Sequence, residues 1–495
     1  MTSRGTSAGP RSDEPGRRSA LHRELHFFEA ASVSVGVMAP TLAMSVTGVA
    51  AAAALGRAAP LAFVVAALGV GLVAFGFVRL AAEFSHAGSV YGFVGNTLGP
   101  RPGFVAGWAL LGTYLVFPPV SIMGVAVFGR AFLATTGLAA DADWYPIALA
   151  AWAVIGVLAA RGVRPTTRSV LVFEVVSVCL ILALMGVIFW RLAAATAPGG
   201  QRFSGSAFVL PPGVGVSALA LAAVSGFLAF AGFESAGSLG EESLAPTRAV
   251  PRAIMTAVAF GAVFYVACIT AQSLGFGTGA AGVSAFRHSQ APLGDLAKRY
   301  VGTPLAALLD LGAVLSALGA GLGGVTVAAR MLFSFGRDGI ASRRLSGVST
   351  ATGVPQRALA AEMLIGLVLL TAFRLAGTSA LNVFFYLATI GTLSLLVMYV
   401  LTNVAAAHHL RRRSLWQVLV PAGGVLIAGF VLYHNLWPVP PPPYEYFPYL
   451  VLGWLAAGMV ITAVVPGFSG KVGAGLERVA EAEAEAARVA PARGP

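Results

Sequence analysis

Glu234 is the residue whose placement most suggests chemistry, because it is an ionisable side chain inside an apolar run. It follows Phe230-Ala231-Gly232-Phe233, and four glycines fall within the fifteen residues 226–240. If this run crosses a membrane, its carboxylate is costly there and is by default a functional candidate. Glu234 could carry a proton, or it could accept hydrogen bonds from free amides and hold the local fold together.

A second interrupted run covers residues 32–48 and contains Val37-Met38-Ala39-Pro40-Thr41. A proline in the middle of a helix removes one hydrogen bond and clashes with the preceding turn, so we expect a break here. A broken helix exposes amides on one half, which can hold a carboxylate, and carbonyls on the other, which can hold an ammonium group or a cation. That pairing suits a zwitterion such as an amino acid. Packing alone is the alternative explanation of the proline.

Two further polar side chains lie in apolar runs. Glu174, in the run 168–193, could carry a proton or could be the satisfied partner of a nearby serine or threonine. The Ser316 hydroxyl could ligate sodium, although helix hydroxyls usually bond to their own backbone. Lysine and arginine are absent from the middle of every apolar run, so neutral amino acids or cationic amines are expected before strongly acidic substrates.

The composition shows which elements must position these residues. The 495 residues are 57% hydrophobic and 11% charged, whereas soluble proteins carry about 25% charged residues. This excludes a soluble enzyme, a disordered scaffold and a nucleic-acid binder. A membrane-spanning helix needs about 20 mostly apolar residues. Twelve segments meet that requirement: 29–53, 58–82, 102–134, 143–162, 168–193, 214–240, 252–277, 300–336, 356–375, 379–408, 416–437 and 443–466. The stretch 89–100 is too polar to span.

The basic residues predict the orientation of these spans. With the amino terminus inside, 24 of the 32 lysines and arginines fall in inside segments and 8 fall outside. Lysine and arginine favour the cytoplasmic side, so we expect a multi-pass protein of the cell membrane with both termini cytoplasmic. The net charge of +12 then faces anionic lipid rather than nucleic acid. The lipid bilayer is an expected partner, and the oligomeric state is left open.

The two interrupted runs lie five spans apart. Because five is an odd number of spans, the second repeat starts on the opposite side of the membrane from the first. Broken helices at matching positions of two such repeats indicate a secondary transporter built from inverted repeats. The predicted organisation is therefore a cytoplasmic tail (1–28), a first repeat (29–193), a second repeat (214–408), two extra helices (416–466) and a second cytoplasmic tail (467–495).

Three stretches of the chain resemble signatures of the amino acid–polyamine–organocation (APC) superfamily and its amino acid permeases. They are Ala87-Gly88-Ser89-Val-Tyr91 with Gly103-Phe104-Val-Ala-Gly107-Trp108; Gly232-Phe233-Glu234 with Pro251-Arg252; and Gly336-Arg337-Asp338-Gly339-Ile340 with Gly353-Val-Pro355. The resemblance covers residues 29–466. It implies an all-α integral membrane protein with 12 transmembrane helices, a leucine-transporter-type 5+5 inverted repeat and two extra helices.

The resemblance also implies a site between the first and sixth helices. One wall would be Val37, Met38, Ala39, Pro40 and Thr41, and the other Phe230, Ala231, Gly232, Phe233 and Glu234. Glu234, Glu174 and Ser316 are the candidates for coupling or gating. The family usually has a glycine-rich run where this chain has Ala39-Pro40-Thr41, so a substrate without a carboxylate stays open. Arg337 and Asp338 should form an inner ion pair that helps close the site, or serve only as positive-inside anchoring.

Other classes of protein fit less well. No G-x-x-x-x-G-K-[ST] loop is present, and the seven histidines lie in tails, loops and span ends without a metal-binding motif. We expect no enzyme activity, no metal and no cofactor apart from a coupling ion, H+ or Na+. The predicted function is a secondary active transporter (permease) for an amino acid or a related small amine, working by alternating access with proton symport. The alternatives are an amino acid or amine exchanger and a non-transporting nutrient receptor.

Overall fold

The computed structural model describes residues 27–84, 90–139, 141–163, 168–242, 246–349, 351–475 and 477. These residues form helices, turns and loops without a β-strand, which confirms the all-α prediction. Most of the predicted tails, and the Ala87-Gly88-Ser89 part of the first signature, lie outside the described residues.

Nine of the helices in these ranges have 18 residues or more. They are α3 (Ala59–Ala81), α5 (Pro100–Thr136), α7 (Arg168–Ala193), α9 (Pro246–Phe276), α12 (Thr303–Arg337), α13 (Gln356–Leu375), α14 (Ala380–Leu410), α15 (Leu415–His434) and α16 (Phe447–Val464). The shorter helices are α1 (Phe27–Met38), α2 (Pro40–Leu55), α4 (Val90–Leu98), α6 (Trp144–Ala160), α8 (Val216–Phe230), α10 (Ala280–His288) and α11 (Pro292–Tyr300). Short 3₁₀ segments are η1 (Gly56–Ala58), η2 (Gly205–Phe208), η3 (Phe233–Glu242), η4 (Arg343–Ser346) and η5 (Tyr444–Tyr446).

Helix occupies each of the twelve predicted segments. Nine helical runs within the described residues are long and apolar enough to cross a membrane, with Ser34–Ala81 counted as one run, and α6 and α8 are shorter apolar helices. The stretch expected not to span contains only the nine-residue α4. Helices α10 and α11, between the seventh and eighth predicted spans, are additional to the predicted elements. The number of crossings and the inverted repeat stay predictions.

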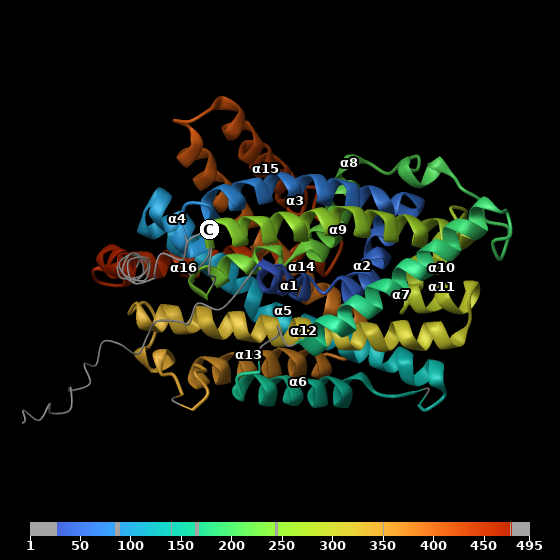
Figure 1. Cartoon of the computed structure of the whole chain (residues 1–495), viewed down its shortest axis with the longest axis horizontal. Helices are drawn as coiled ribbons and strands as arrows, with labels where there is room; N and C mark the ends of the chain where they lie inside the picture. Colours follow the sequence, from blue (N-terminus) through green and yellow to red (C-terminus); the bar gives the residue numbers. More distant parts are fainter. Residues whose placement is uncertain are drawn as a thin grey trace, which may run out of the picture.

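The helices run mostly side by side along the long axis of the molecule (Figure 1). Helices α1, α2, α5 and α14 lie in the middle, α3 and α9 on one side of them, and α12, α13 and α6 on the other. Helix α5 packs along both α12 and α14. The short helices α10 and α11 lie at one end of the bundle and α4 at the other, while α15 projects from its side (Figure 1).

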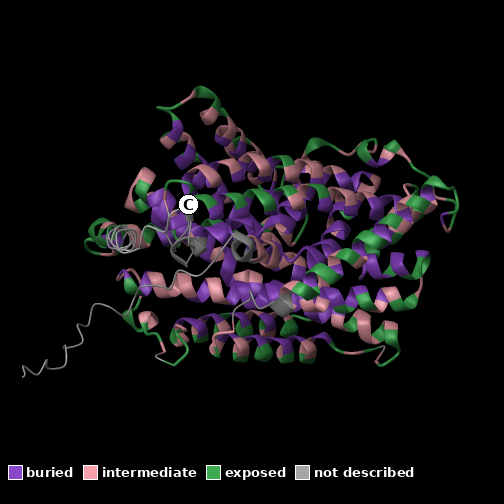
Figure 2. Cartoon of the chain, viewed as in Figure 1, coloured by how far each residue is buried: buried purple, intermediate pink, exposed green. Residues whose placement is uncertain are grey.

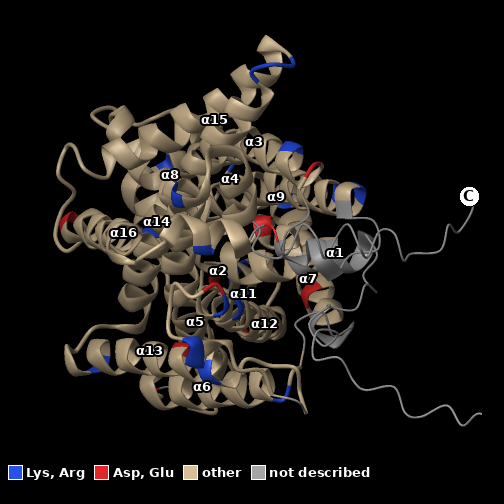
Figure 3. Ribbon diagram, turned by 90° about the vertical axis from the view of Figure 1, so that its left-hand side faces the viewer, with Lys and Arg blue, Asp and Glu red and all other residues tan. Residues whose placement is uncertain are grey.

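Burial and charge follow this arrangement. Buried residues gather on the central helices, whereas α7, α6 and α13 carry an exposed face (Figure 2). On α7 that face is apolar and includes Val172, Phe173, Val175 and Trp190, as expected for a lipid-facing helix. Figure 3 shows how few charged residues the helices carry. The central helices approach closely through small residues: a side chain at Gly391 of α14 would meet Phe117 of α5 at 2.4 Å.

Candidate functional site

The first predicted break is present between α1 and α2. Helix α1 ends at Met38, and Ala39 adopts a left-handed conformation (φ 46°, ψ 62°) before Pro40 begins α2. Proline suits the first position of a helix because its missing N–H would have no partner there. A left-handed alanine costs about 1–2 kcal/mol, so the surrounding packing must enforce the turn.

The second predicted break is present between α8 and η3. Helix α8 ends at Phe230, Ala231 leaves the helical region (φ −56°, ψ 130°) and Gly232 has φ 109°. A glycine is favoured at such a positive φ because it has no Cβ. The chain then continues as the 3₁₀ segment η3 rather than as an α-helix. The expectation of a single interrupted helix over 214–240 therefore missed the change of helix type.

The two breaks lie against each other. A Cβ on Gly232 would stand 2.7 Å from Val37 Cγ1 and 2.8 Å from the Met38 amide nitrogen. The Ser34 hydroxyl donates to the Phe233 carbonyl at 2.9 Å and accepts from the Ala236 amide at 3.3 Å. One serine of α1 thus satisfies two backbone groups that the second break leaves free.

Glu234 is buried and fully engaged at the second break. One carboxylate oxygen accepts from the Tyr114 hydroxyl of α5 at 3.2 Å. The other accepts from the Gly232 amide at 3.1 Å and from the Tyr399 hydroxyl of α14 at 3.3 Å. These contacts match the scaffold interpretation, in which the carboxylate holds broken-helix amides. A role of Glu234 in transport stays a prediction.

Glu174 and Ser316 meet at the first break. A carboxylate oxygen of Glu174, on α7, accepts from the Thr41 amide at 2.8 Å. The Ser316 hydroxyl, on α12, accepts from the Leu42 amide at 3.2 Å. Pro40 has no N–H, and the Ala43 amide donates to the Ala39 carbonyl at 2.9 Å. The two amides between them are therefore capped by side chains of two other helices. Glu174 is therefore a satisfied partner: it accepts from the Thr41 amide and interacts with the side chains of Ser316 and Thr41.

Two buried hydroxyls complete the surroundings of Glu174. Thr41 Oγ1 and Tyr265 Oη make no hydrogen bond within the described part of the chain. Both belong to residues that interact electrostatically with Glu174. Glu174 and these two hydroxyls are thus buried polar groups between α2, α7 and α9.

A cavity of about 60 Å³ opens beside the breaks. Val37, Met38 and Ala39 line it from the first break and Ala231 from the second. Aromatic residues line it from other helices, and no charged side chain does so among the described residues. The other lining residues used below are Tyr114, Phe117 and Ser121 of α5, and Phe384 of α14.

Four of the ten predicted substrate-binding residues thus line the cavity, and six lie outside its lining. The six are Pro40, Thr41, Phe230, Gly232, Phe233 and Glu234. Phe230 packs edge-on against Tyr265 with ring centroids 5.0 Å apart. Phe233 packs against Phe77 and Tyr399, each at 5.5 Å. Both phenylalanines are buried and lie outside the lining of the cavity.

Sequence reasoning missed the cavity residues of α5 and α14. Tyr114 is the most informative of them, since it lines the cavity and also donates to Glu234. It links the cavity to a carboxylate that does not itself face it. The only unusual sequence feature near these residues is the tandem Pro118-Pro119 inside α5, directly after Phe117.

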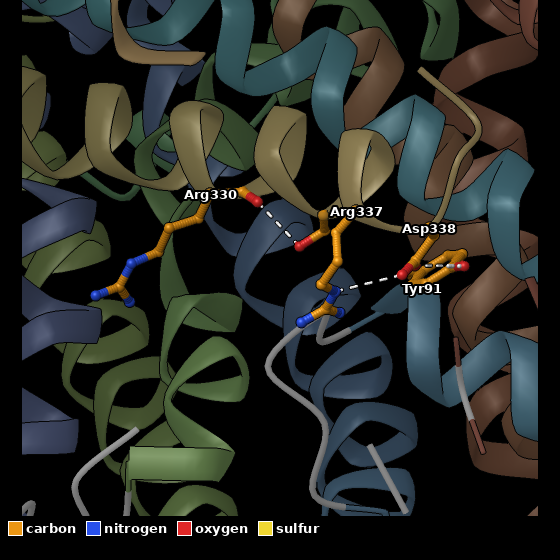
Figure 4. A network of polar contacts seen from close by, with 5 residues as sticks. Tyr91, Arg330, Arg337 and Asp338 are labelled. Carbon is orange, nitrogen blue, oxygen red and sulfur yellow. Dashed lines mark hydrogen bonds and ion pairs between the residues drawn. The ribbon is translucent and has the colours of Figure 1, made fainter. Parts of the chain in front are cut away.

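A polar network lies at the end of the bundle where α12 ends (Figure 4). Arg337 Nε pairs with Asp338 Oδ1 at 3.3 Å, and the Tyr91 hydroxyl of α4 donates to Asp338 Oδ2 at 3.2 Å. The Ser334 hydroxyl donates to the Arg330 carbonyl at 2.9 Å. The predicted Arg337–Asp338 pair is therefore confirmed, and the hydrogen bond from Tyr91 joins Asp338, at the end of α12, to α4. Closure of the inner side stays a prediction.

Comparison with known proteins agrees with this architecture. A protein-family profile described as amino acid permease matches residues 25–461. The chain is 24% identical to the methylthioribose transporter of Bacillus subtilis (strain 168) over 437 residues, 84% of this chain and 88% of that protein. It is 26% identical to the branched-chain amino acid permease BcaP of the same organism over 348 residues, 66% and 70% of the two chains. It is 23% identical to the low-affinity putrescine importer PlaP of Escherichia coli (strain K12) over 292 residues, 58% and 61%.

The profile covers most of the chain and confirms the resemblance seen in the three signatures. The chain belongs to the amino acid permease family and is a multi-pass membrane protein of the transporter class, not an enzyme.

Proposed function

We propose that the protein is a secondary active transporter that carries a small amino acid or amine through the cavity between the two breaks by alternating access. The observation that carries the proposal is the meeting of the breaks, where Gly232 packs against the backbone of Val37 and Met38 beside the cavity. Paired broken helices at a mid-membrane cavity are typical of inverted-repeat transporters. The twelve crossings and the 5+5 repeat belong to this proposal.

We assign coupling to Glu174, with proton symport as the mode and exchange as the alternative. Glu174 of α7 accepts from the Thr41 amide of α2, and Ser316 of α12 accepts from the Leu42 amide of the same helix. Protonation of the carboxylate would weaken its bond to the Thr41 amide and loosen α2 from α7. A single titrating group would then govern a contact between helices that must move apart.

The contact between Tyr114 and Glu234 is a second proposed link between the substrate and a buried carboxylate. Tyr114 lines the cavity and donates to Glu234, so a substrate that moves the tyrosine also moves a partner of the carboxylate.

The proposed location is the cell membrane with both termini cytoplasmic. It is supported by the 24 of 32 basic residues that fall in inside segments.

The test is uptake into proteoliposomes of labelled neutral amino acids, basic amino acids, ethanolamine and a diamine. Each is measured with and without an inward proton gradient, an inward sodium gradient and internal substrate. Gradient-driven uptake supports symport, and uptake that requires internal substrate supports exchange. Ligand binding without uptake under every condition would contradict the transporter proposal and favour a receptor.

The coupling residues are tested in the same liposomes. Glu174→Gln keeps an oxygen that can accept from Thr41 but cannot titrate, so uptake should persist and lose its dependence on the proton gradient. Glu234→Gln tests the second carboxylate in the same way. Glu362→Gln is the matched control, because Glu362 is a buried carboxylate of α13 that lines no part of the cavity. Unchanged gradient dependence in Glu174→Gln would remove Glu174 from the coupling mechanism.

A further inference from the structure

The first residues of the predicted second tail form a helix that packs against the bundle. Residues 468–475, which follow α16, are helical, and we call them the tail helix. Phe468, Val472 and Gly475 are buried, whereas residues 469–471 are exposed. The buried positions are four and three residues apart, so they share one face of the helix. The tail helix is therefore held by a single face.

The buried face of the tail helix contacts three elements of the bundle. Phe468 and Val472 share a buried apolar cluster with one aromatic residue from each of them. These residues are Tyr91 of α4, Phe104 of α5 and Phe335 of α12. The rings of Phe104 and Phe468 meet edge to face with centroids 5.1 Å apart, and Phe104 packs on Phe335 at 5.2 Å. One short helix thus bridges the start of α5, the end of α12 and α4.

The tail helix also covers Asp338. A Cβ on Gly475 would stand 2.9 Å from Asp338 Cγ and 3.0 and 3.1 Å from its two carboxylate oxygens. The Asp338 side chain is only 1% exposed, and its partners Arg337 and Tyr91 come from α12 and α4 (Figure 4). Burial of a charged carboxylate costs free energy. Hydration of Asp338 therefore opposes the docking of the tail helix, whereas burial of its apolar face favours it.

The sequence of the tail helix also favours release. Three of its eight residues are glycines, the poorest helix formers after proline. For Gly470 and Gly473, no atom of the described residues outside the local helix backbone lies within 4 Å of the place where a Cβ would stand. Packing does not require a glycine at either position. The tail helix thus depends on its docked face for stability and should unfold when that face is released.

We propose that the tail helix is a releasable latch on this end of the bundle. While it is docked, it joins α4, α5 and α12 and keeps Asp338 out of water. Its release unfolds the segment and exposes the aromatic cluster and the carboxylate. Alternating access requires each end of a transporter to open in turn, so the docked latch restrains opening at this end. The inference adds a control element to the proposed transport function, but the docking contact itself does not depend on that function.

Two glycine-to-alanine variants in the tail helix form a matched pair. Gly475→Ala places a methyl group within 3.1 Å of three atoms of Asp338, whose carboxylate is fixed by two partners, so the helix is displaced. Gly473→Ala meets no atom of the described residues within 4 Å and only strengthens the helix. Phe468→Ala removes the ring that packs on α5 and is a second, independent way to release the latch.

The readouts are amide hydrogen exchange in lipid nanodiscs and counterflow uptake of labelled leucine and putrescine into proteoliposomes. Gly475→Ala and Phe468→Ala should raise exchange by about tenfold or more in the tail helix, in α4 and in the last turn of α12, because a docked contact is lost there. Exchange elsewhere should stay unchanged, and the initial rate of uptake should rise. Gly473→Ala should lower exchange in the tail helix and should not raise uptake.

Three results would overturn the latch. Exchange that rises only in the tail helix would make it a passive cover, because α4 and α12 would stay joined without it. Exchange that rises throughout the chain would make the contact part of the global fold. Exchange that rises at α4 and α12 with unchanged uptake would show that the contact does not restrain transport.

Failure of the transport proposal is a separate outcome. Wild-type protein that takes up no compound of the panel contradicts that proposal. The exchange pattern of the three variants still decides whether the tail helix holds α4, α5 and α12 together.

Discussion

Replacing Gly232 by alanine should destabilise the protein more than any other single methyl group added at the breaks. The new Cβ would stand 2.7 Å from Val37 Cγ1, 2.8 Å from the Met38 nitrogen and 2.9 Å from the Val37 carbonyl carbon. Two of these three atoms belong to the backbone, so a side-chain rotation cannot relieve the overlap. In addition, the residue must keep a φ of 109°, which a Cβ disfavours.

The magnitude follows from these two costs. Overpacking a filled interior costs about 1–3 kcal/mol, and a left-handed backbone costs a non-glycine residue about 1–2 kcal/mol. Together they predict a loss of about 2–5 kcal/mol in the free energy of unfolding. The break could also shift to avoid the overlap, and uptake would then fall as the cavity walls Val37 and Ala231 move.

The assay is unfolding of the detergent-solubilised protein by heat and by SDS, with counterflow uptake measured in parallel. Gly429→Ala is the control. It lies inside α15, and outside its own helix backbone no atom comes within 4 Å of the place the added methyl group would take. It should therefore gain up to about 1 kcal/mol from helix propensity. If Gly232→Ala were as stable as wild type and transported normally, the close approach of the two breaks would not be a constraint on the fold.

Three further substitutions have expected outcomes. Tyr399→Phe removes one donor to Glu234 and should cost about 1.5–3 kcal/mol in the same unfolding assay, the range for hydrogen bonds to charged groups; no loss would mean that water replaces the hydroxyl. Trp454→Phe should lower the free energy of unfolding by about 1–3 kcal/mol, because the rings of Trp108 and Trp454 stack at 4.2 Å and each indole N–H donates to the backbone carbonyl of the other residue. Normal stability would show that this pair does not hold α5 and α16 together. Glu362→Met should raise stability by about 1–3 kcal/mol, because both carboxylate oxygens are buried without a hydrogen-bond partner among the described residues; a loss of stability would reveal a partner for the carboxylate.

The positions of the elements could be predicted from the sequence because each is set by local features. The apolar runs are long and are separated by polar or basic residues, so most of their ends agree with the helix ends within a few residues. Pro40 and Gly232 likewise break helices through their own covalent structure. Both breaks were therefore predictable from single residues.

The partners at the breaks could not be predicted in the same way. Glu174 and Thr41 are 133 residues apart, and Leu42 and Ser316 are 274 apart. Nothing local to Glu174 distinguishes a proton carrier from a cap of another helix. Most cavity residues of α5 and α14 are similarly apolar or aromatic side chains in apolar helices, and only the packing of distant segments selects which of them face the cavity.

The double hydrogen bond of Ser34 has a kinetic consequence. Because one hydroxyl joins α1 to both Phe233 and Ala236, neither α1 nor η3 can tilt alone without leaving backbone groups unsatisfied in an apolar interior. Helix α1 and the 3₁₀ segment η3 are thus expected to reorient in one concerted step with a common relaxation time. Loss of this hydroxyl would separate that step into two motions with different rates.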